Sequence, residues 1–348
     1  MNSHPVRIAA LVGAGMVAGT HLAACAHTQD KLKLKGLLSR GGPRAVKLAE
    51  EAAGQLGQVL MLYASIDQLA ADEAVDFAII ATPPNAREDI IAPLAEAGKH
   101  ILLEKPIGRT ALEAEHIVSI CRDAGVQLGV VFQHRARLAS RKAQELVLSE
   151  RLGQLGVVEI SVPWWRDQQY YDEPGRGTYE RDGGGVLISQ AIHTIDLALS
   201  LTGPVSSVSA MAATSRFHSM ESEDFVVAAL QFANGAVGSM RASTASFPGG
   251  SETITLHFDN ASLHLESGEL VVSYRDGSQQ HVGEQSSTGG GADPIAFTHH
   301  GHQQVLENFI DTLNGEADIL ASGNDAINAQ RLIDATLLAA KSHTVQLL

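Results

Sequence analysis

The sequence is poor in cysteine, in aromatic residues and in basic charge, and these shortages exclude several classes of protein. Its two cysteines, Cys25 and Cys121, cannot build a disulfide framework, which fits a reducing compartment. A formal net charge of −14 at pH 7 disfavours nonspecific binding to nucleic acid or to an anionic membrane, since both need a basic surface. After Cys25 no apolar run approaches the roughly 18 residues of a membrane span. We therefore expect a cytoplasmic protein with neither kind of partner.

The length and composition are those of a globular protein with more than one domain. A chain of 348 residues can bury a large core and predicts two domains, because a typical domain holds roughly 100–200 residues. Hydrophobic residues make up 45% of the chain and charged residues 18%, which are ordinary values for such a protein. The stretch Ser-Ser-Thr-Gly-Gly-Gly at 286–291 predicts a mobile loop.

The first third of the chain alternates apolar runs of strand length with helical stretches. Nearly continuous apolar strands separated by helices predict a parallel sheet covered on both faces. The fold class is therefore α/β, with a Rossmann-type domain over residues 1–134. We expect its strands at 6–12, 32–38, 75–81, 100–103 and 127–132, and helices at 21–26, 43–53, in the stretch that ends at Ala97, and at 111–123.

The stretch from Leu11 to Cys25 has two interpretations. Its apolar character and its ending, Leu-Ala-Ala-Cys, resemble the signal of an exported lipoprotein. The same stretch contains Gly13-x-Gly15-x-x-Ala18, a dinucleotide-binding fingerprint. A strand before it, a helix after it and the repeated strand–helix units favour the fingerprint, because removal of the stretch would delete the first strand of the sheet. We expect the cofactor to contact Gly13, Gly15, Met16 and Val17.

The residues after the second predicted strand indicate which nicotinamide cofactor is bound. Domains that prefer NAD place an acidic residue there for the ribose hydroxyls. This chain has Ser39 and Arg40, and its next carboxylate is Glu50. A guanidinium suits the extra phosphate of NADP, so the sequence favours NADP slightly over NAD. The alternative is a solvated arginine, with Ser39 hydrogen-bonded to a ribose hydroxyl of NAD.

From residue 135 to 348 the pattern predicts an α+β domain with a large, mostly antiparallel sheet. Polar and apolar residues alternate, as in Thr-Ile-Thr-Leu-His-Phe at 253–258, and Asn234-Gly235 is a strong hairpin turn. The more open face of this sheet is a candidate contact between subunits, and a C-terminal helix can pack back on the first domain. We expect strands at 157–162, 205–213, 225–232, 236–243, 253–258, 262–266 and 269–274, and helices at 302–313 and 325–342.

Two segments carry residues suited to catalysis. Lys105, in Glu104-Lys105-Pro106, follows the fourth predicted strand at the carboxyl edge of the sheet, where ligands of open α/β folds bind. A lysine there can hold a substrate hydroxyl and stabilise developing alkoxide charge, although a surface lysine paired with Glu104 is an equal interpretation. His193 follows a triple glycine at 183–185, and helical spacing places Ser189 on the same face. Histidine is the natural acid/base near neutral pH, but a buried core histidine is the commoner case.

Together these motifs resemble the Gfo/Idh/MocA oxidoreductase family, which includes glucose-fructose oxidoreductase and inositol dehydrogenase. The resemblance runs in order over essentially the whole chain. It implies a Rossmann domain that binds NAD(P), a second domain whose sheet commonly forms dimers or tetramers, and catalysis by Lys105 and His193. It also implies that Thr82, Pro83 and Glu104 line the cofactor together with Lys105. The motifs that carry it are Gly13-Ala14-Gly15, Thr82-Pro83-Pro84, Ala97 to His100, Glu104-Lys105-Pro106 and Gly183 to Asp196.

The chain departs from the family pattern at two positions. Many members carry Asp four residues before the histidine, whereas this chain has Ser189, which can hydrogen-bond but cannot take a proton. Members often show a histidine shortly after the Thr-Pro segment, whereas this chain has Arg87, which we therefore do not predict as a site residue.

An aromatic segment between the two catalytic candidates suits a sugar-like substrate. Both tryptophans and three of the five tyrosines fall between Trp164 and Tyr179. Aromatic faces can stack on sugar C–H groups while arginine and hydroxyl groups bond its oxygens; the alternative is a packed structural loop. A histidine cluster at 299–302 is expected to be a solvated helix start, and we expect no metal. The predicted substrate contacts are Lys105, Trp165, Arg166, Tyr171, Arg176, Ser189, Gln190 and His193.

The sequence thus predicts an NAD(P)-dependent oxidoreductase that interconverts a secondary alcohol and a ketone on a sugar, inositol or related polyol. We expect a homodimer or homotetramer assembled through the second sheet. The competing hypothesis is a non-catalytic NAD(P)-binding sensor or regulator with the same fold, which the loss of the family Asp at Ser189 keeps open.

Overall fold

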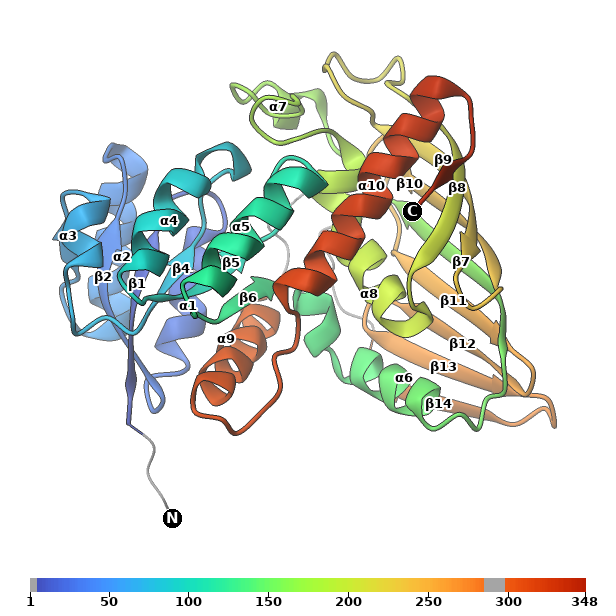
Figure 1. The fold of residues 1–348 in the computed structure, drawn as a ribbon, viewed down its shortest axis with the longest axis horizontal. Helices are drawn as coiled ribbons and strands as arrows, with labels where there is room; N and C mark the ends of the chain where they lie inside the picture. Colours follow the sequence, from blue (N-terminus) through green and yellow to red (C-terminus); the bar gives the residue numbers. More distant parts are fainter. Residues whose placement is uncertain (1–4, 285–297) are drawn as a thin grey trace. The chain divides into compact units, whose positions relative to one another are not determined.

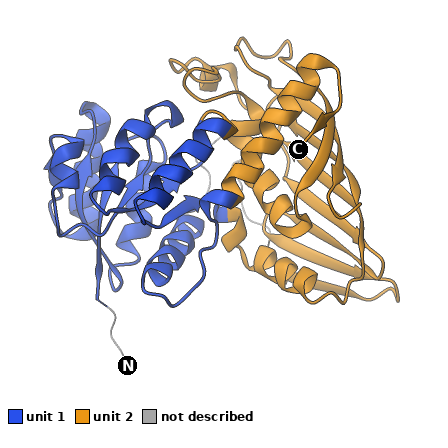
Figure 2. Cartoon of the chain, viewed as in Figure 1, with its two compact units in different colours: residues 1–108, 112–133, 298–324 blue, residues 109–111, 134–297, 325–348 orange. Residues whose placement is uncertain are grey.

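The computed structural model describes residues 5–284 and 298–348 and divides the chain into two compact units (Figure 2). Unit 1 holds residues 1–108, 112–133 and 298–324, and unit 2 holds residues 109–111, 134–297 and 325–348. The loop predicted at 286–291 lies outside the described residues. Within the described part of the chain, no helix combines the length and the apolar character that crossing a bilayer needs.

Unit 1 is built on a six-stranded sheet whose strands all pair in parallel (Figure 1). The spatial order β3-β2-β1-β4-β5-β6 is that of a dinucleotide-binding fold, which confirms the predicted Rossmann domain. All four residues of β4 are buried, as expected for a central strand covered on both faces. The strands are β1 Arg7–Val12, β2 Leu32–Leu38, β3 Met61–Tyr63, β4 Phe77–Ile80, β5 His100–Glu104 and β6 Leu128–Val131.

The helices of unit 1 lie between consecutive strands, with one exception from the end of the chain. The α9 helix, His300–Leu313, belongs to this unit, and its Phe309 ring meets that of Phe77 edge-on at 5.3 Å between centroids. A short strand and a short helix after residue 60 were not predicted, because each is five residues or fewer. The remaining helices are α1 Ala18–Ala26, α2 Pro43–Leu56, α3 Ile66–Ala70, α4 Glu88–Glu96 and α5 Ala111–Asp123, the last of which begins at the unit boundary.

Unit 2 is built on a nine-stranded sheet in the order β14-β13-β12-β11-β7-β10-β9-β8-β15 (Figure 1). Among the strands that the structure describes in this sheet, only β7 and β10 pair in parallel, so the predicted mostly antiparallel sheet is confirmed. Buried and exposed residues alternate along β9, which leaves one face of this strand open. The strands are β7 Leu155–Pro163, β8 Val205–Ala213, β9 Phe225–Phe232, β10 Val237–Ser243, β11 Thr253–Phe258, β12 Ala261–Glu266, β13 Glu269–Tyr274, β14 Gln279–Gly283 and β15 Gln346–Leu347.

The helices of unit 2 carry the second group of predicted site residues. The π-helical turn Leu187–Ala191 runs directly into α8, Ile192–Thr202, so the predicted helix after the triple glycine begins with an irregular turn. π-helical turns are rare, and they occur frequently at functional sites. The other helices are α6 Leu138–Leu148, α7 Gln168–Tyr171 and α10 Gly323–Ser342, the last of which begins at the unit boundary.

Candidate active site

The glycine fingerprint forms a tight turn between β1 and α1. Gly13 has φ of +109° and donates its N–H to the Leu38 carbonyl at 2.9 Å. A Cβ on Gly13 would lie 2.7 Å from the Ala81 carbonyl oxygen, so only glycine fits. No described side chain caps the N-terminus of α1, so its first N–H groups can receive an anion. Gly15 and Met16 are exposed beside this turn, and Val17 is half-buried.

The residues predicted to select the cofactor follow β2 on the same unit. Ser39 is half-buried, and its Oγ accepts the N–H of Gly41 at 3.2 Å. Arg40 is exposed and makes no hydrogen bond or ion pair with the described residues. An exposed guanidinium at this position remains available to an anionic group.

Thr82 and Lys105 follow β4 and β5, which pair with each other in parallel. They therefore lie at the same carboxyl edge of the sheet, where open α/β folds bind ligands. The Thr82 hydroxyl oxygen is buried and finds no hydrogen-bond partner among the described residues. A ligand that supplies this partner would complete the site, so this edge and the uncapped α1 fit a dinucleotide.

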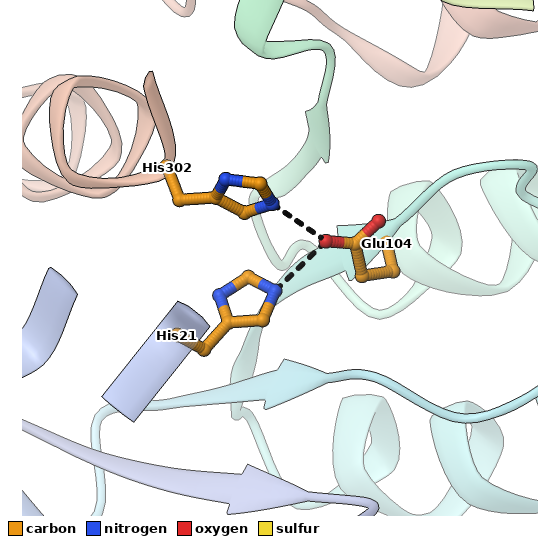
Figure 3. Close-up of side chains that lie close together, drawn as sticks. All are labelled: His21, Glu104 and His302. Atoms are coloured by element: carbon orange, nitrogen blue, oxygen red, sulfur yellow. Dashed lines mark hydrogen bonds and ion pairs between the residues drawn. The ribbon is translucent and has the colours of Figure 1, made fainter. Parts of the chain in front are cut away.

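Glu104, the last residue of β5, is 6% exposed and has partners on both carboxylate oxygens. Oε1 accepts Nε2–H groups from His21 at 2.8 Å and from His302 at 3.3 Å (Figure 3). Oε2 accepts the Lys105 N–H at 3.2 Å. Burial opposes its ionisation, but the two histidines outweigh burial and hold the pKa of Glu104 well below its usual range. The carboxylate is therefore charged throughout the neutral range.

The prediction of a solvated histidine cluster was wrong for His302, which is 3% exposed. The first turn of α9 directs this ring toward His21, with 5.1 Å between the ring centroids in an edge-on arrangement. Burial lowers the pKa of His302 even though Glu104 opposes the shift, so its imidazole is neutral at pH 7. Sequence reasoning missed this contact because the two histidines lie far apart in the chain.

The same cluster is the group of described residues best arranged for a metal ion. Possible ligand atoms of His21, Glu104 and His302 all lie within 4.8 Å of one another. However, both imidazoles already share Oε1, and positive charge acts on the cluster from Arg87 and Lys105. A divalent cation would be opposed by both charges, so the cluster is better described as a hydrogen-bonded assembly.

Arg87, which sequence reasoning set aside, is fully buried at the carboxyl edge of unit 1. Its Nη2 and Nε donate to the Thr82 carbonyl at 2.9 and 3.1 Å. Longer hydrogen bonds reach the Ile107 carbonyl at 3.4 Å and the Lys105 carbonyl at 3.5 Å. Burial lowers the pKa of Arg87 to about 9, against the opposing charge of Glu104, so the guanidinium stays charged at pH 7. The feature of the sequence that could have indicated a role for Arg87 is its position shortly after the Thr-Pro segment, where family members often carry a histidine.

In unit 2 the end of the triple glycine at 183–185 is hydrogen-bonded to the side chain of Glu223. Its carboxylate accepts the N–H groups of Gly185 at 3.2 Å and Leu187 at 3.1 Å. A Cβ on Gly185 would collide with the Glu223 carbonyl, which explains why glycine is needed. Burial raises the pKa of Glu223 to about 7, because the backbone donors only partly offset it.

His193 lies in the first turn of α8 and is 7% exposed. The His134 ring lies 5.1 Å from it between centroids, with 31° between the ring planes, a neighbour that the sequence did not predict. Asp196, on the same helix, instead forms a bidentate ion pair with Arg135, both hydrogen bonds being 2.7 Å long. Ser189 in the π-helical turn is half-buried.

The aromatic segment brings several predicted substrate residues together around Tyr170. The Tyr170 hydroxyl accepts from Arg176 Nη1 and from Gln190 Nε2, each at 3.1 Å. The Arg176 guanidinium also lies over the Tyr170 ring, 4.6 Å from its centroid. Arg166 is 4% exposed and lies 5.4 Å from the Trp164 ring centroid. Tyr170 was not among the substrate contacts predicted from the sequence, although it is the partner that Arg176 and Gln190 share.

The other aromatic residues of unit 2 differ in exposure. Tyr171 is 7% exposed and its hydroxyl bonds the Thr244 hydroxyl at 2.6 Å, so it faces the interior. Trp165 is half-buried and meets the exposed rings of Phe217 and Phe247 edge-on, at 6.0 and 5.4 Å between centroids. These two phenylalanines were not predicted, because they lie far from the aromatic segment in sequence.

Comparison with known proteins gives two family matches that together span most of the chain. Residues 7–132 match the oxidoreductase family with an NAD-binding Rossmann fold, and residues 140–264 match the GFO/IDH/MocA C-terminal domain. Inositol 2-dehydrogenase of Rhizobium meliloti is 26% identical over 339 residues, covering 94% of each chain. D-glucoside 3-dehydrogenase of Escherichia coli is 29% identical over 210 residues, covering 58% of this chain and 56% of the relative.

A solved structure resembles the whole chain. The WlbA dehydrogenase from Bordetella pertussis, in complex with NADH and UDP-GlcNAcA, has a TM-score of 0.82 and 26% identity and covers 99% of both chains. Several curated relatives match only in part: the chain spans about half of their length, as with an uncharacterized oxidoreductase of Schizosaccharomyces pombe, of which it covers 45%.

Proposed function

The chain belongs to the Gfo/Idh/MocA family of NAD-binding oxidoreductases, and we propose that it interconverts a secondary alcohol and a ketone on a sugar, inositol or related polyol. The observation that carries this proposal is the position of Lys105. It follows β5 at the carboxyl edge of unit 1, beside the buried Thr82 hydroxyl that lacks a partner among the described residues. The similarity to inositol 2-dehydrogenase over 94% of the chain supports the substrate class.

The cofactor would be held by backbone groups of unit 1. The turn at Gly13 and Gly15, together with Met16, Val17 and the first amides of α1, would receive the phosphates. Thr82, Pro83 and Glu104 would line the cofactor at the carboxyl edge, next to Lys105. When bound, the nicotinamide accepts or supplies the hydride. We propose NADP as the preferred form, because Arg40 is an exposed cation where domains that prefer NAD place a carboxylate.

Lys105 and His193 would divide the proton chemistry between them. The Lys105 ammonium would donate a hydrogen bond to the reacting oxygen and stabilise the negative charge that develops when the hydride leaves the carbon. His193 would accept the hydroxyl proton in oxidation and return it in reduction. Ser189 would hydrogen-bond the substrate without taking a proton.

The aromatic segment would select a sugar-like ring. Trp165 would offer its half-buried ring for stacking, while Arg176 and Gln190 would bond hydroxyl groups beside Tyr170. Arg166 and Tyr171 would act from the interior, since both are nearly covered. We also propose that the open face of the nine-stranded sheet forms a homodimer or homotetramer, which light scattering would measure.

A panel of sugars, inositols and sugar acids, each offered with NAD⁺ and NADP⁺, tests the activity by the absorbance of the reduced cofactor. Lys105→Ala should lower turnover on the best substrate by about 10²-fold or more, because the oxygen loses its charged donor. Its cofactor affinity, measured by fluorescence quenching, should change little. The exposed Lys47 supplies the matched control, Lys47→Ala, with unchanged turnover. Full turnover in Lys105→Ala would refute the catalytic assignment.

Ser189 supports one alternative function, a sensor or regulator that binds NAD(P) without turning it over. The resemblance places an Asp in this position in many members, and the serine here cannot accept a proton. Tight cofactor binding without turnover across the whole panel would favour the sensor. Measurable turnover that depends on Lys105 would exclude it.

A further inference from the structure

Two buried charged side chains hold the peptide groups on either side of Lys105. The Glu104 carboxylate accepts the Lys105 N–H at 3.2 Å through Oε2. The Arg87 guanidinium donates to the Lys105 carbonyl through Nη2 at 3.5 Å. Lys105 therefore leaves the sheet edge with a negative group on one side of its backbone and a positive group on the other.

The anionic side of this arrangement is anchored in three elements of unit 1. Glu104 ends β5, His21 lies on α1 and His302 lies in the first turn of α9, and both imidazoles meet Oε1 (Figure 3). All three side chains are at least nine-tenths buried, so the carboxylate cannot turn away without losing these partners. This anchoring fixes the direction from which the Lys105 N–H is held.

The cationic side of the arrangement joins two neighbouring strand ends. Arg87 makes its two shortest hydrogen bonds to the Thr82 carbonyl after β4, at 2.9 and 3.1 Å. The same guanidinium reaches the carbonyls of Lys105 and Ile107 after β5. A fork with donors on three nitrogens can serve both segments at once, whereas the donors of a lysine lie on a single nitrogen and a histidine has at most two. Arg87 thus links the Thr82 segment after β4 to the Lys105 segment after β5.

We infer that Arg87 is a positioning residue for Lys105, acting with Glu104 as its counterpart. This inference rests on the proposed function, because it assigns Arg87 to the lysine that the proposal places in catalysis. Arg87 fixes the backbone from which the ammonium projects, and its charge favours the neutral form of the nearby lysine. Among the described residues, the charged groups that contact the Lys105 backbone are Arg87 and Glu104, and His302, whose pKa is lowered by burial, lies neutral behind the carboxylate.

Competitive labelling measures this effect without a substrate. The full chain is treated with trace acetic anhydride from about pH 6 to 11, and the acetylation of Lys105 is read by peptide mass spectrometry, with the exposed Lys47 as internal reference. In Arg87→Met the labelling midpoint of Lys105 should rise by about one pH unit, because a neighbouring cation is lost. In Arg87→Lys, which keeps the charge, the midpoint should stay at the wild-type value. An unchanged midpoint in Arg87→Met would overturn the inference.

Turnover on the best substrate of the panel measures the positioning itself. Arg87→Met should lower kcat by about 10²-fold, because small displacements of a catalytic group are costly, and Arg87→Lys by about 10-fold, because the fork is lost. The exposed Arg122 supplies the matched control, Arg122→Met, with unchanged kcat. If Arg87→Met fails to fold, Arg87→Lys decides: wild-type kcat would contradict the inference.

The outcomes separate this inference from the proposed function. Loss of turnover in Lys105→Ala with wild-type behaviour of both Arg87 variants would overturn only the role of Arg87. Full turnover in Lys105→Ala would overturn the catalytic role of the lysine itself. One equivalent of Zn²⁺ bound by the purified chain and lost in His302→Gln would also contradict the inference, because Glu104 would then be a metal ligand.

Discussion

One glutamate in each unit is buried to nearly the same extent, yet the two titrate in opposite directions. Glu104 in unit 1 is 6% exposed, and its pKa is held well below the usual range. Glu223 in unit 2 is 4% exposed, and its pKa is raised to about 7. Burial alone raises the pKa of a carboxyl, so the difference lies in the partners.

Glu104 has two histidines on one oxygen and the charge of Arg87 nearby. The Glu223 carboxylate accepts hydrogen bonds from backbone N–H groups, among them those of Gly185 and Leu187, and the neighbouring Asp224 adds a like charge. Side-chain donors and a cation therefore keep one carboxyl ionised, while backbone donors leave the other close to half-protonated at neutral pH. The charge of Glu104 at the carboxyl edge of unit 1 is therefore constant near neutral pH. The charge of Glu223, which binds the glycine segment before His193, changes with pH in the same range.

The largest expected effect comes from removing the fixed charge. Glu104→Gln should lower the free energy of unfolding by about 3 to 5 kcal/mol at pH 7, because Arg87 loses its buried counter-charge and an amide nitrogen replaces one of the two buried acceptor oxygens. Urea unfolding measures this loss. The same substitution at the exposed Glu96 should change stability by less than about 0.5 kcal/mol. An equal loss of unfolding free energy at Glu104 and at Glu96 would show that the buried cluster does not stabilise the fold.

Glu104 and Glu223 should also give opposite pH dependences. The folded pKa of Glu223 is raised above its unfolded value of 4.5, so its contribution is full below pH 4.5 and is lost as pH rises through about 7. Wild-type protein should therefore lose up to about 3 kcal/mol more than Glu223→Gln between pH 4.5 and 8. The Glu104 contribution has the reverse sign and is lost only in acid, as pH falls below 4.5 through the lowered folded pKa. A parallel pH profile of wild type and Glu223→Gln would contradict the raised pKa.

The sequence was sufficient to predict the parts of the molecule that depend on local pattern. The βα alternation, the fingerprint at Gly13 and the alternating strands of unit 2 each have a period or a turn signal, and both sheets were confirmed. The short β3 and the edge strands β14 and β15 were missed, because segments this short carry too few residues to show a period. The π-helical turn before His193 was missed for a similar reason, since its hydrogen bonds span only one residue more than those of an α-helix.

The candidate site was less predictable, because its contacts join residues distant in sequence. His302 meets Glu104 across 198 positions, and Tyr170 joins Arg176 to Gln190 from a separate helix. No spacing rule relates such positions; only the folded chain brings them together. Arg87 carried a signal in its departure from the family pattern, but its role depends on backbone carbonyls that no sequence pattern reveals.

The smallest expected effect sharpens the contrast between buried and exposed charge in unit 1. Arg40 makes no hydrogen bond or ion pair with the described residues, so Arg40→Ala should change the free energy of unfolding by less than about 0.5 kcal/mol. If its guanidinium pairs with the phosphate that distinguishes NADP, affinity for NADPH should fall by about tenfold, while affinity for NADH stays within about twofold. Fluorescence titration measures both affinities, with Arg122→Ala as the exposed control. An unchanged ratio of the two affinities would show that Ser39 and Arg40 do not select the cofactor.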